Sequence, residues 1–164
     1  MPMNITSKSR YALKIMMDLA NQKGAITHRA EIAQRQGIPL DYMDQILGRL
    51  REGRLIDSIR GRSGGYRLAR EARSISVHDI FTMVEDAFEP VRCLEGGVSC
   101  TMEHACSSKD AWTTISTAIR QALSGILLAD LADHAWPASL AAVDLGIQEC
   151  RAPRRRSGAE ELNS

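Results

Sequence analysis

The sequence predicts a mainly α-helical protein with a small β-hairpin wing, in which a winged helix-turn-helix domain is followed by a long dimerisation helix. Three observations support this prediction. Apolar residues recur at three- and four-residue steps in several segments, a pattern typical of amphipathic helices. A short alternating hairpin with a glycine-rich tip occupies residues 55–69. Three of the four cysteines fall within residues 93–106, just before the last long amphipathic segment.

Composition limits the class of protein. The chain has 164 residues, of which 44% are hydrophobic and 4% aromatic, enough for an aliphatic core. It contains no apolar run of about 18 residues and no apolar stretch near its first residue, so we expect no membrane association, a cytoplasmic location, and cysteines that are thiols or metal ligands. No C-x-x-C motif, phosphate-binding loop or Ser/His/Asp arrangement favours an enzyme, so a non-enzymatic protein is expected.

The charge is distributed unevenly along the chain. Residues 1–70 hold 13 Lys/Arg and 6 Asp/Glu, a net charge of +7, whereas residues 71–164 hold 8 and 14, a net charge of −6. The two halves together give the overall net charge of +1. A basic half beside an acidic half predicts a polyanionic partner for the first half only.

Three helices are expected in the basic half. The first covers residues 7–23, whose apolar residues share one face. The second, over 28–36, is expected to be capped by Thr27 and stopped by Gly37, and the third has Pro39 in its first turn. Two helices joined by a short glycine-containing turn are typical of a helix-turn-helix.

The segments LIDSIR and YRLA, joined by GRSGG, predict the wing. Its small tip residues permit close approach to a phosphate backbone or a minor groove. The lack of an aromatic stacking platform favours double-stranded DNA as the partner, against the alternative of a merely solvated basic face. The candidate DNA-binding residues are Tyr42, Gln45 and Arg49 on the third helix, Arg60, Arg62, Ser63 and Gly64 on the wing, and Lys8, Arg10 and His28.

The acidic half predicts further helices. Ser76 is expected to cap a helix over 76–88 that closes the DNA-binding domain. From Lys109 a helix much longer than the others is expected, and a small domain cannot bury all of its apolar stripe, so we expect a homodimer; folding back on its own chain is the alternative. A short helix over 126–136 is expected to pack in the dimer as well. The stripe consists of Trp112, Ile115, Ile119, Ala122 and Ile126.

The predicted organisation has four parts. Residues 1–88 form the winged helix-turn-helix DNA-binding domain, 89–108 the cysteine-rich loop, 109–134 the dimerisation helix region, and 135–164 a disordered tail. Cys150 falls in the tail and is expected to be a spare thiol.

The other three cysteines are candidate metal ligands. Thiolates on a short glycine-containing loop can converge on one soft metal centre, and Cys93, Cys100 and Cys106 have this arrangement. Adding His104 would complete a tetrahedral zinc site. Spacing alone leaves zinc and an iron-sulfur cluster as equal alternatives, with metal-free thiols third.

The segments TSKSRYALKIMMDLA and IPLDYMDQILGRLREGRLIDSIRGRSGGYRL, followed by the cysteine loop and a long helix, resemble the family of iron-sulfur winged-helix transcription regulators that includes IscR, NsrR and RirA. The resemblance implies a homodimer with crossed long helices. It also implies a [2Fe-2S] or [4Fe-4S] cluster on the three cysteines, which makes zinc less favoured. By position, Tyr42 and Gln45 would face the major groove and Arg60 the minor groove. Asp44 stands where IscR-like proteins carry a glutamate beside the base-reading surface, so it joins the candidate DNA-binding residues.

Two positions depart from the family pattern. Lys109 stands where IscR has a histidine, and Arg10 stands where an NsrR-like protein has an aspartate, so the fourth ligand is unassigned. Its candidates are His104, Glu103, Asp110, a small thiol or water.

The CLEGGVSC run is closer to the iron-responsive members of the family. The predicted function is therefore a dimeric transcription regulator whose operator binding is controlled by an iron-sulfur cluster, sensing iron or cluster supply. The alternatives are a nitric oxide or redox sensor with the same fold and a zinc-stabilised, non-enzymatic adaptor.

Overall fold

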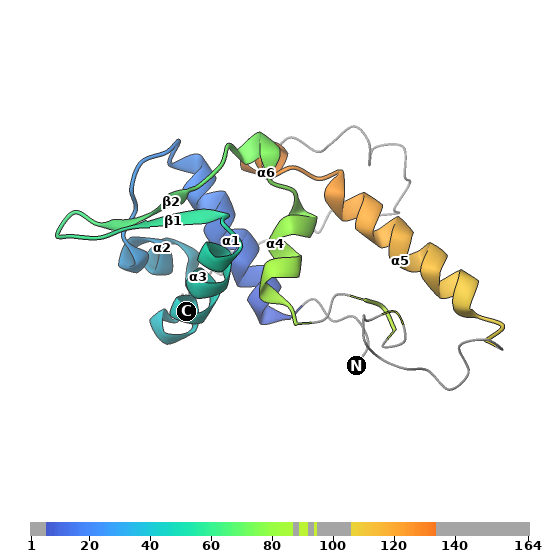
Figure 1. The fold of residues 1–164 in the computed structure, drawn as a ribbon. Helices are drawn as coiled ribbons and strands as arrows, with labels where there is room; N and C mark the ends of the chain where they lie inside the picture. Colours follow the sequence, from blue (N-terminus) through green and yellow to red (C-terminus); the bar gives the residue numbers. More distant parts are fainter. Residues whose placement is uncertain (1–5, 87–88, 92–93, 95–105, 134–164) are drawn as a thin grey trace, which may run out of the picture.

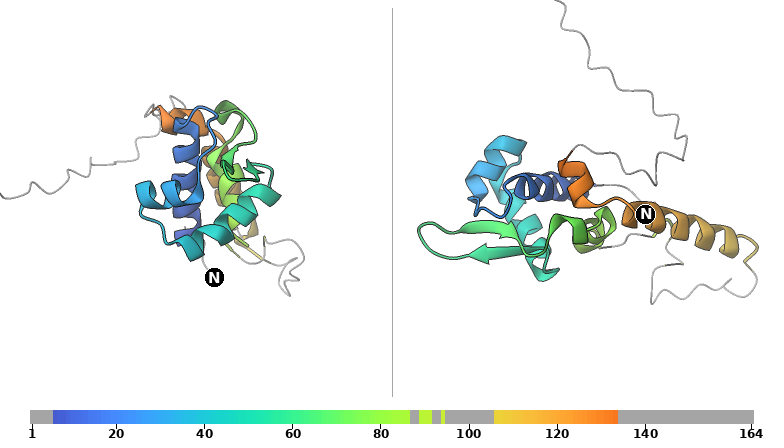
Figure 2. Two further views of the ribbon diagram at one scale, coloured as in Figure 1. Left: turned by 90° about the vertical axis from the view of Figure 1, so that its left-hand side faces the viewer. Right: turned by 90° about the horizontal axis from the view of Figure 1, so that it is seen from above.

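The computed structural model describes residues 6–86, 89–91, 94 and 106–133. Figure 1 shows a helical body with a β-hairpin projecting on one side and a helix projecting on the other, and the right-hand view in Figure 2 shows the same elongated arrangement from above. The mainly helical fold with a two-stranded wing is as predicted. In chain order the elements are α1 (Ser7–Asn21), α2 (Arg29–Gln36), α3 (Leu40–Glu52), β1 (Ile56–Ile59), β2 (Gly65–Leu68), a 3-10 turn η1 (Ala72–Ser74), α4 (Val77–Val84), α5 (Lys109–Ser124) and α6 (Leu128–Ala132).

Helix α1 lies at the centre of the body and contacts α2, α3, α4, α6 and β2. The Thr6 hydroxyl caps its first turn by accepting a hydrogen bond from the Lys8 backbone N–H at 3.1 Å. Its apolar residues Ala12, Ile15 and Met16 are fully buried, at the three- and four-residue spacing that the sequence predicted. The core of the domain therefore forms around one face of α1.

Helices α2 and α3 form the predicted helix-turn-helix. Gly37 ends α2 in the left-handed conformation, with φ +63°, and its backbone N–H bonds to Ala33 O. Pro39 occupies the N-cap position of α3 and not its first turn. Thr27 does not cap α2 as expected, because His28 takes the N-cap position. Thr27 is buried instead and exchanges two backbone hydrogen bonds of 2.9 Å with Tyr66 of β2, which extends the base of the wing.

The wing is the antiparallel pair of β1 and β2, with Ile56 opposite Leu68 and Ile59 opposite Gly65. Ile56 is 1% exposed and anchors the hairpin in the core, while Asp57 and Arg67 face solvent as a cross-strand pair. A Cβ at Gly65 would lie 2.5 Å from Thr27 O, so only glycine allows the close contact at the base of the wing.

Ser76 caps α4 as predicted, in a capping box with Asp79. The helix ends at Val84, earlier than the expected position 88. Its Val77, Ile80, Phe81 and Val84 side chains are buried against α1 and α3 and close the domain.

The region after the cysteines differs from expectation in one way. Helix α5 has 16 residues against 15 in α1, so it is not much longer than the other helices. Helix α6 packs against α1 and η1 of its own chain, where Leu128 is fully buried, and its packing in a dimer stays a prediction. Two backbone bonds hold this segment: Val77 N–H donates to Ile126 O at 2.9 Å, and Leu128 N–H donates to Ile75 O at 2.8 Å.

Part of the predicted organisation lies outside the described residues. This holds for nearly all of the cysteine-rich loop at 89–108 and for the predicted tail at 135–164, including Cys150. Among the helices that are described, none is long and apolar enough to cross a membrane.

One buried carboxylate links α1 to α2. Asp18 is 4% exposed and accepts hydrogen bonds from Arg35 Nε at 2.9 Å, Arg35 Nη2 at 2.7 Å and Gln36 Nε2 at 3.1 Å. Burial raises the pKa of Asp18, but these hydrogen bonds and the Arg35 charge lower it more, so the pKa lies below its ordinary value. The ionised carboxylate therefore stabilises the folded state.

We predict that Asp18→Asn lowers the free energy of unfolding by about 1–3 kcal/mol at neutral pH, because a charged hydrogen-bond acceptor is lost from a buried site. Since the folded-state pKa is lowered, the stabilisation is complete above the unfolded pKa of about 4 and is lost as the pH falls through the folded value. Urea unfolding of the wild type and Asp18→Asn should therefore show a difference in the free energy of unfolding that becomes smaller at acid pH.

The matched control is Asp57→Asn, which removes an exposed carboxylate that lies 3.6 Å from Arg67. It should change the free energy of unfolding by less than about 0.5 kcal/mol. A loss of free energy of unfolding in Asp18→Asn that stays constant from neutral to acid pH would contradict the lowered pKa of Asp18.

Candidate nucleic-acid interface

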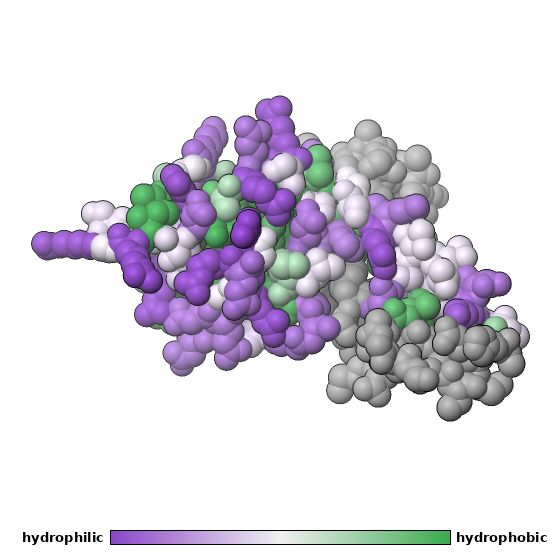
Figure 3. All heavy atoms as spheres, viewed as in Figure 1, coloured by the Kyte–Doolittle hydropathy of each residue, from purple (hydrophilic) through white to green (hydrophobic). Residues whose placement is uncertain are grey.

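The predicted DNA-binding residues lie on α1, α3 and the wing. Gln45 is exposed on α3, opposite the face that buries Met43 and Leu47. Hydrophilic side chains dominate the wing and the neighbouring helical face in Figure 3. A groove of about 310 Å³ is lined by Lys8 of α1 and by Asp44, Gln45 and Arg49 of α3, so the structure brings four of the predicted residues together.

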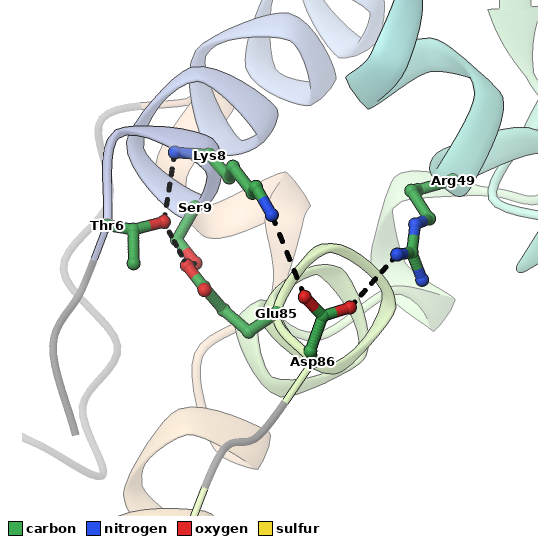
Figure 4. Close-up of polar contacts among 6 residues, drawn as sticks. All are labelled: Thr6, Lys8, Ser9, Arg49, Glu85 and Asp86. Atoms are coloured by element: carbon green, nitrogen blue, oxygen red, sulfur yellow. Dashed lines mark hydrogen bonds and ion pairs between the residues drawn. The ribbon is translucent and has the colours of Figure 1, made fainter. Parts of the chain in front are cut away.

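Two of the predicted cations in this groove share one carboxylate. Arg49 Nη2 lies 2.9 Å from Asp86 Oδ1, and Lys8 Nζ lies 3.8 Å from Asp86 Oδ2 (Figure 4). The adjacent Glu85 accepts hydrogen bonds from the hydroxyls of Thr6 at 2.5 Å and Ser9 at 2.6 Å. The end of α4 is thus tied to the start of α1 and to the third helix.

Asp44 is also engaged. Arg29 of α2 binds both of its carboxylate oxygens, at 2.6 and 2.5 Å, and the hydrogen bond raises the pKa of the Arg29 guanidinium. Each of the two side chains is 51% exposed, so solvent and DNA can both compete for the pair. The pair joins α2 to the predicted reading surface of α3.

Tyr42 does not point freely into solvent. Its ring packs edge-on against Tyr11 of α1, with centroids 5.6 Å apart and planes at 77°. It is partly buried against the core, which leaves part of its surface available to a ligand.

The wing loop places Arg60, Arg62 and Ser63 in solvent. Gly61 has φ +112°, and Gly64 N–H closes the loop on Gly61 O at 3.0 Å. Gly64 itself is buried, and a Cβ there would lie 2.3 Å from Ile59 O, so its role is to close the loop tightly and not to present a side chain.

Arg10 and His28 are the remaining predicted residues. Arg10 is exposed on α1, and His28 is exposed at the N-cap position of α2 without a side-chain cap bond. Both therefore lie on the surface, as a DNA contact requires.

Of the predicted metal ligands, only Cys106 is within the described residues, since Cys93, Cys100 and His104 are outside them. Its thiol is partly exposed and lies 3.5 Å from the Ser108 hydroxyl. The hydrogen bond from Ser108 lowers the pKa of the Cys106 thiol, which favours the thiolate that binds metals. No group of three metal-ligating side chains occurs in the described part of the chain.

The sequence analysis missed Arg29 and Asp86. Both are charged surface residues with no distinguishing sequence pattern. The fold brings Arg29 to Asp44, and it brings Asp86 to Lys8 and Arg49. The sequence could have indicated Asp86 only by its position between the helix that closes the domain and the cysteine loop.

The chain matches a family of transcriptional regulators and is similar to named members of that class. The family described as "Rrf2: Iron-dependent Transcriptional regulator" matches residues 5–134. The HTH-type transcriptional regulator IscR of Yersinia pseudotuberculosis is 37% identical over 134 residues, which is 80% of each chain.

Solved structures agree with these relatives. CymR, the global cysteine regulator of B. subtilis, is similar with 33% identity and a TM-score of 0.64, over 81% of this chain and 98% of that one. The IscR of T. potens is similar with 32% identity and a TM-score of 0.62, over 80% of this chain and 87% of that one.

These relatives are transcriptional regulators and not enzymes, which confirms the predicted class of protein, the predicted resemblance and the winged-helix fold. Together with the helix-turn-helix, the wing and the groove that holds Lys8, Gln45 and Arg49, they support a DNA-binding regulator. The chain belongs to the Rrf2 family of transcriptional regulators.

Proposed function

We propose that this protein is a dimeric, operator-binding regulator that senses iron or cluster supply through an iron-sulfur cluster. The observation that supports it most is the position of Asp86. This residue binds Lys8 and Arg49 of the DNA-binding surface, and the chain leaves it directly toward the three cysteines. The family description "Iron-dependent Transcriptional regulator" favours iron as the signal. The proposed site of action is the cytoplasm.

The donor set fits an iron-sulfur cluster. Cys93, Cys100 and Cys106 would hold it, and the lowered pKa of the Cys106 thiol suits a thiolate ligand. A bound cluster would supply a redox-active iron centre whose assembly depends on the supply of iron. The fourth ligand has no assigned residue, and His104, Glu103 and Asp110 are its candidates in the chain.

The dimer is supported by the surface of α5. Trp112 is 37% exposed and Ile115 is 42% exposed, and Ser116 is the only buried residue of the helix. A second copy of α5 would cover this apolar surface. Two recognition helices in one dimer would then face successive major grooves.

Asp86 provides the proposed coupling. While it holds Arg49 and Lys8, their charges are partly neutralised and their side chains are directed toward α4. A conformational change in the cysteine segment would move Asp86 and alter how these two cations reach the phosphates. The state of the cysteines would thus change operator affinity without any contact between them and DNA.

Redox sensing by the same cysteines is the second candidate. The partial exposure of Cys106 favours it, because an accessible thiolate is also the form that oxidants attack. It uses the same fold and the same DNA-binding surface.

We expect protein purified without oxygen to contain iron and acid-labile sulfide and to absorb visible light. Cys93→Ser, Cys100→Ser or Cys106→Ser should remove most of the iron, because a cluster needs its thiolate ligands. Cys150→Ser is the matched control and should keep the cluster. A colourless protein that holds zinc and binds DNA unchanged would overturn the sensor proposal.

We expect Gln45→Ala to relax base preference at one position of each half-site. A side-chain pair to a base edge contributes about 1–3 kcal/mol of discrimination, so the preference should fall about five- to 150-fold. The measurement is sequence selection from a random duplex pool, with the exposed Gln34→Ala of α2 as control. An unchanged selected sequence would argue against Gln45 as a reading residue.

We expect Asp86→Asn to weaken the link between cluster state and DNA binding. The ratio of duplex affinities between cluster-loaded and iron-depleted protein should move toward one by about two- to tenfold, because two exposed ion pairs are removed. Fluorescence anisotropy on both forms measures this ratio.

Asp57→Asn is the matched control for this variant, since it removes the same charge from an ion pair of the wing, which does not lead into the cysteine segment along the chain. Its ratio should equal that of the wild type. An unchanged ratio in Asp86→Asn would exclude Asp86 as the coupling residue.

A further inference from the structure

A second groove, rich in arginine, lies beside the wing, apart from the groove that holds Gln45. It has a volume of about 620 Å³ and runs between the C-terminal end of α3 and the outer side of β1. Four exposed arginines line it: Arg51, Arg54, Arg60 and Arg70. We call these four residues the arginine groove.

These four arginines are gathered in one groove and have no acidic partner among the described residues. Arg29, Arg35, Arg49, Arg67 and Arg120 each form an ion pair with a carboxylate. Within the described residues, no carboxylate lies within ion-pair distance of the arginine groove. Asp57 borders the groove, but its carboxylate forms an ion pair with Arg67, whose Nε lies 3.6 Å from Asp57 Oδ2. Four clustered positive charges repel one another, and an anion that enters the groove relieves this repulsion.

The backbone under the groove is fixed by the core. Arg54 has φ +53° in the turn between α3 and β1, and the next two residues, Leu55 and Ile56, are each 1% exposed. Leu55 N–H donates to Leu50 O and Leu55 O accepts from Ala69 N–H, both at 3.0 Å. The guanidinium groups therefore project from a preorganised surface, which lowers the entropy cost of binding.

The position of the groove selects its occupant. Arg60 belongs both to the arginine groove and to the tip of the wing, and Arg51 lies on the last turn of the recognition helix α3. The groove is thus continuous with the DNA-binding surface. Guanidinium forks bind phosphate oxygens in pairs, and a row of them suits a repeating phosphate chain.

We propose that the arginine groove binds the phosphate backbone of duplex DNA beside the base pairs that α3 reads. This inference rests on the proposed DNA-binding function and extends it to flanking DNA. The contacts carry no base preference, so they set affinity and salt dependence and not the operator sequence.

The test uses the full chain and a duplex selected from a random pool by the wild-type protein. The duplex is prepared as the selected core alone and with about 10 extra base pairs on each side, one helical turn. Dissociation constants are measured by anisotropy over a range of KCl concentrations. For Arg51→Gln/Arg54→Gln we expect the slope of log K against log salt on the long duplex to become shallower by about 1.8, which is about 0.9 for each lost phosphate contact. The selected sequence should stay the same.

The matched control is Lys23→Gln/Arg73→Gln, which removes the same charge at two exposed cations outside the groove. It should leave the slope within about 0.5 of the wild type. Lengthening the duplex should strengthen binding by the wild type and the control, and not by the groove variant. Thermal unfolding checks that all variants are folded.

The outcomes distinguish a failure of the proposed DNA-binding function from a failure of the groove inference alone. If the wild-type protein selects no duplex, the DNA-binding function itself fails. If it selects one and the groove variant keeps the wild-type slope on the long duplex, only the groove inference is overturned. That last result is the one expected if the groove held an acidic protein segment instead of DNA.

Discussion

Burial of one face of α1 is the constraint on which the rest of the molecule depends. Ala12, Ile15 and Met16 are fully buried. A fully buried Ile or Met side chain contributes about 1.5–3 kcal/mol to folding. Helices α2, α3, α4 and α6 all pack on α1, so its position fixes the recognition helix and the end of α4 at once. The DNA-reading surface and the start of the cysteine segment therefore share one rigid support.

The cations of the surface fall into two groups. Arg29, Arg49 and Lys8 are engaged by carboxylates of neighbouring elements, whereas the arginine groove has no acidic partner among the described residues. In the proposed function, the paired cations would respond to a change in their partners, and the arginine groove would attract a polyanion whether or not the cysteines hold a cluster. This division would separate contacts that can be regulated from contacts that give constant affinity.

Most of the fold could be predicted because it depends on local patterns. The period of the apolar residues, the turn at Gly37 and the cap at Ser76 correctly indicated the helices, and GRSGG indicated the wing. One error arose where a tertiary contact decides, because Thr27 joins β2 and does not cap α2. Of the candidate interface, the sequence indicated Lys8, Asp44 and Arg49 but not their ion-pair partners. These partners, Asp86 and Arg29, come from other elements and are brought close only by the fold.

The short backbone bridge between α6 and the start of α4 has a mechanical consequence. Val77 bonds to Ile126 and Leu128 bonds to Ile75, so the C-terminal end of α5 is fastened to the DNA-binding domain. The middle of α5 is held as well, because Glu89, before the cysteines, accepts hydrogen bonds from the Ser116 hydroxyl and the Arg120 guanidinium. In the proposed mechanism, a change in the cysteine segment would therefore alter the angle of α5 against the DNA-binding domain. In the proposed dimer, this change of angle would alter the distance between the two α3 helices.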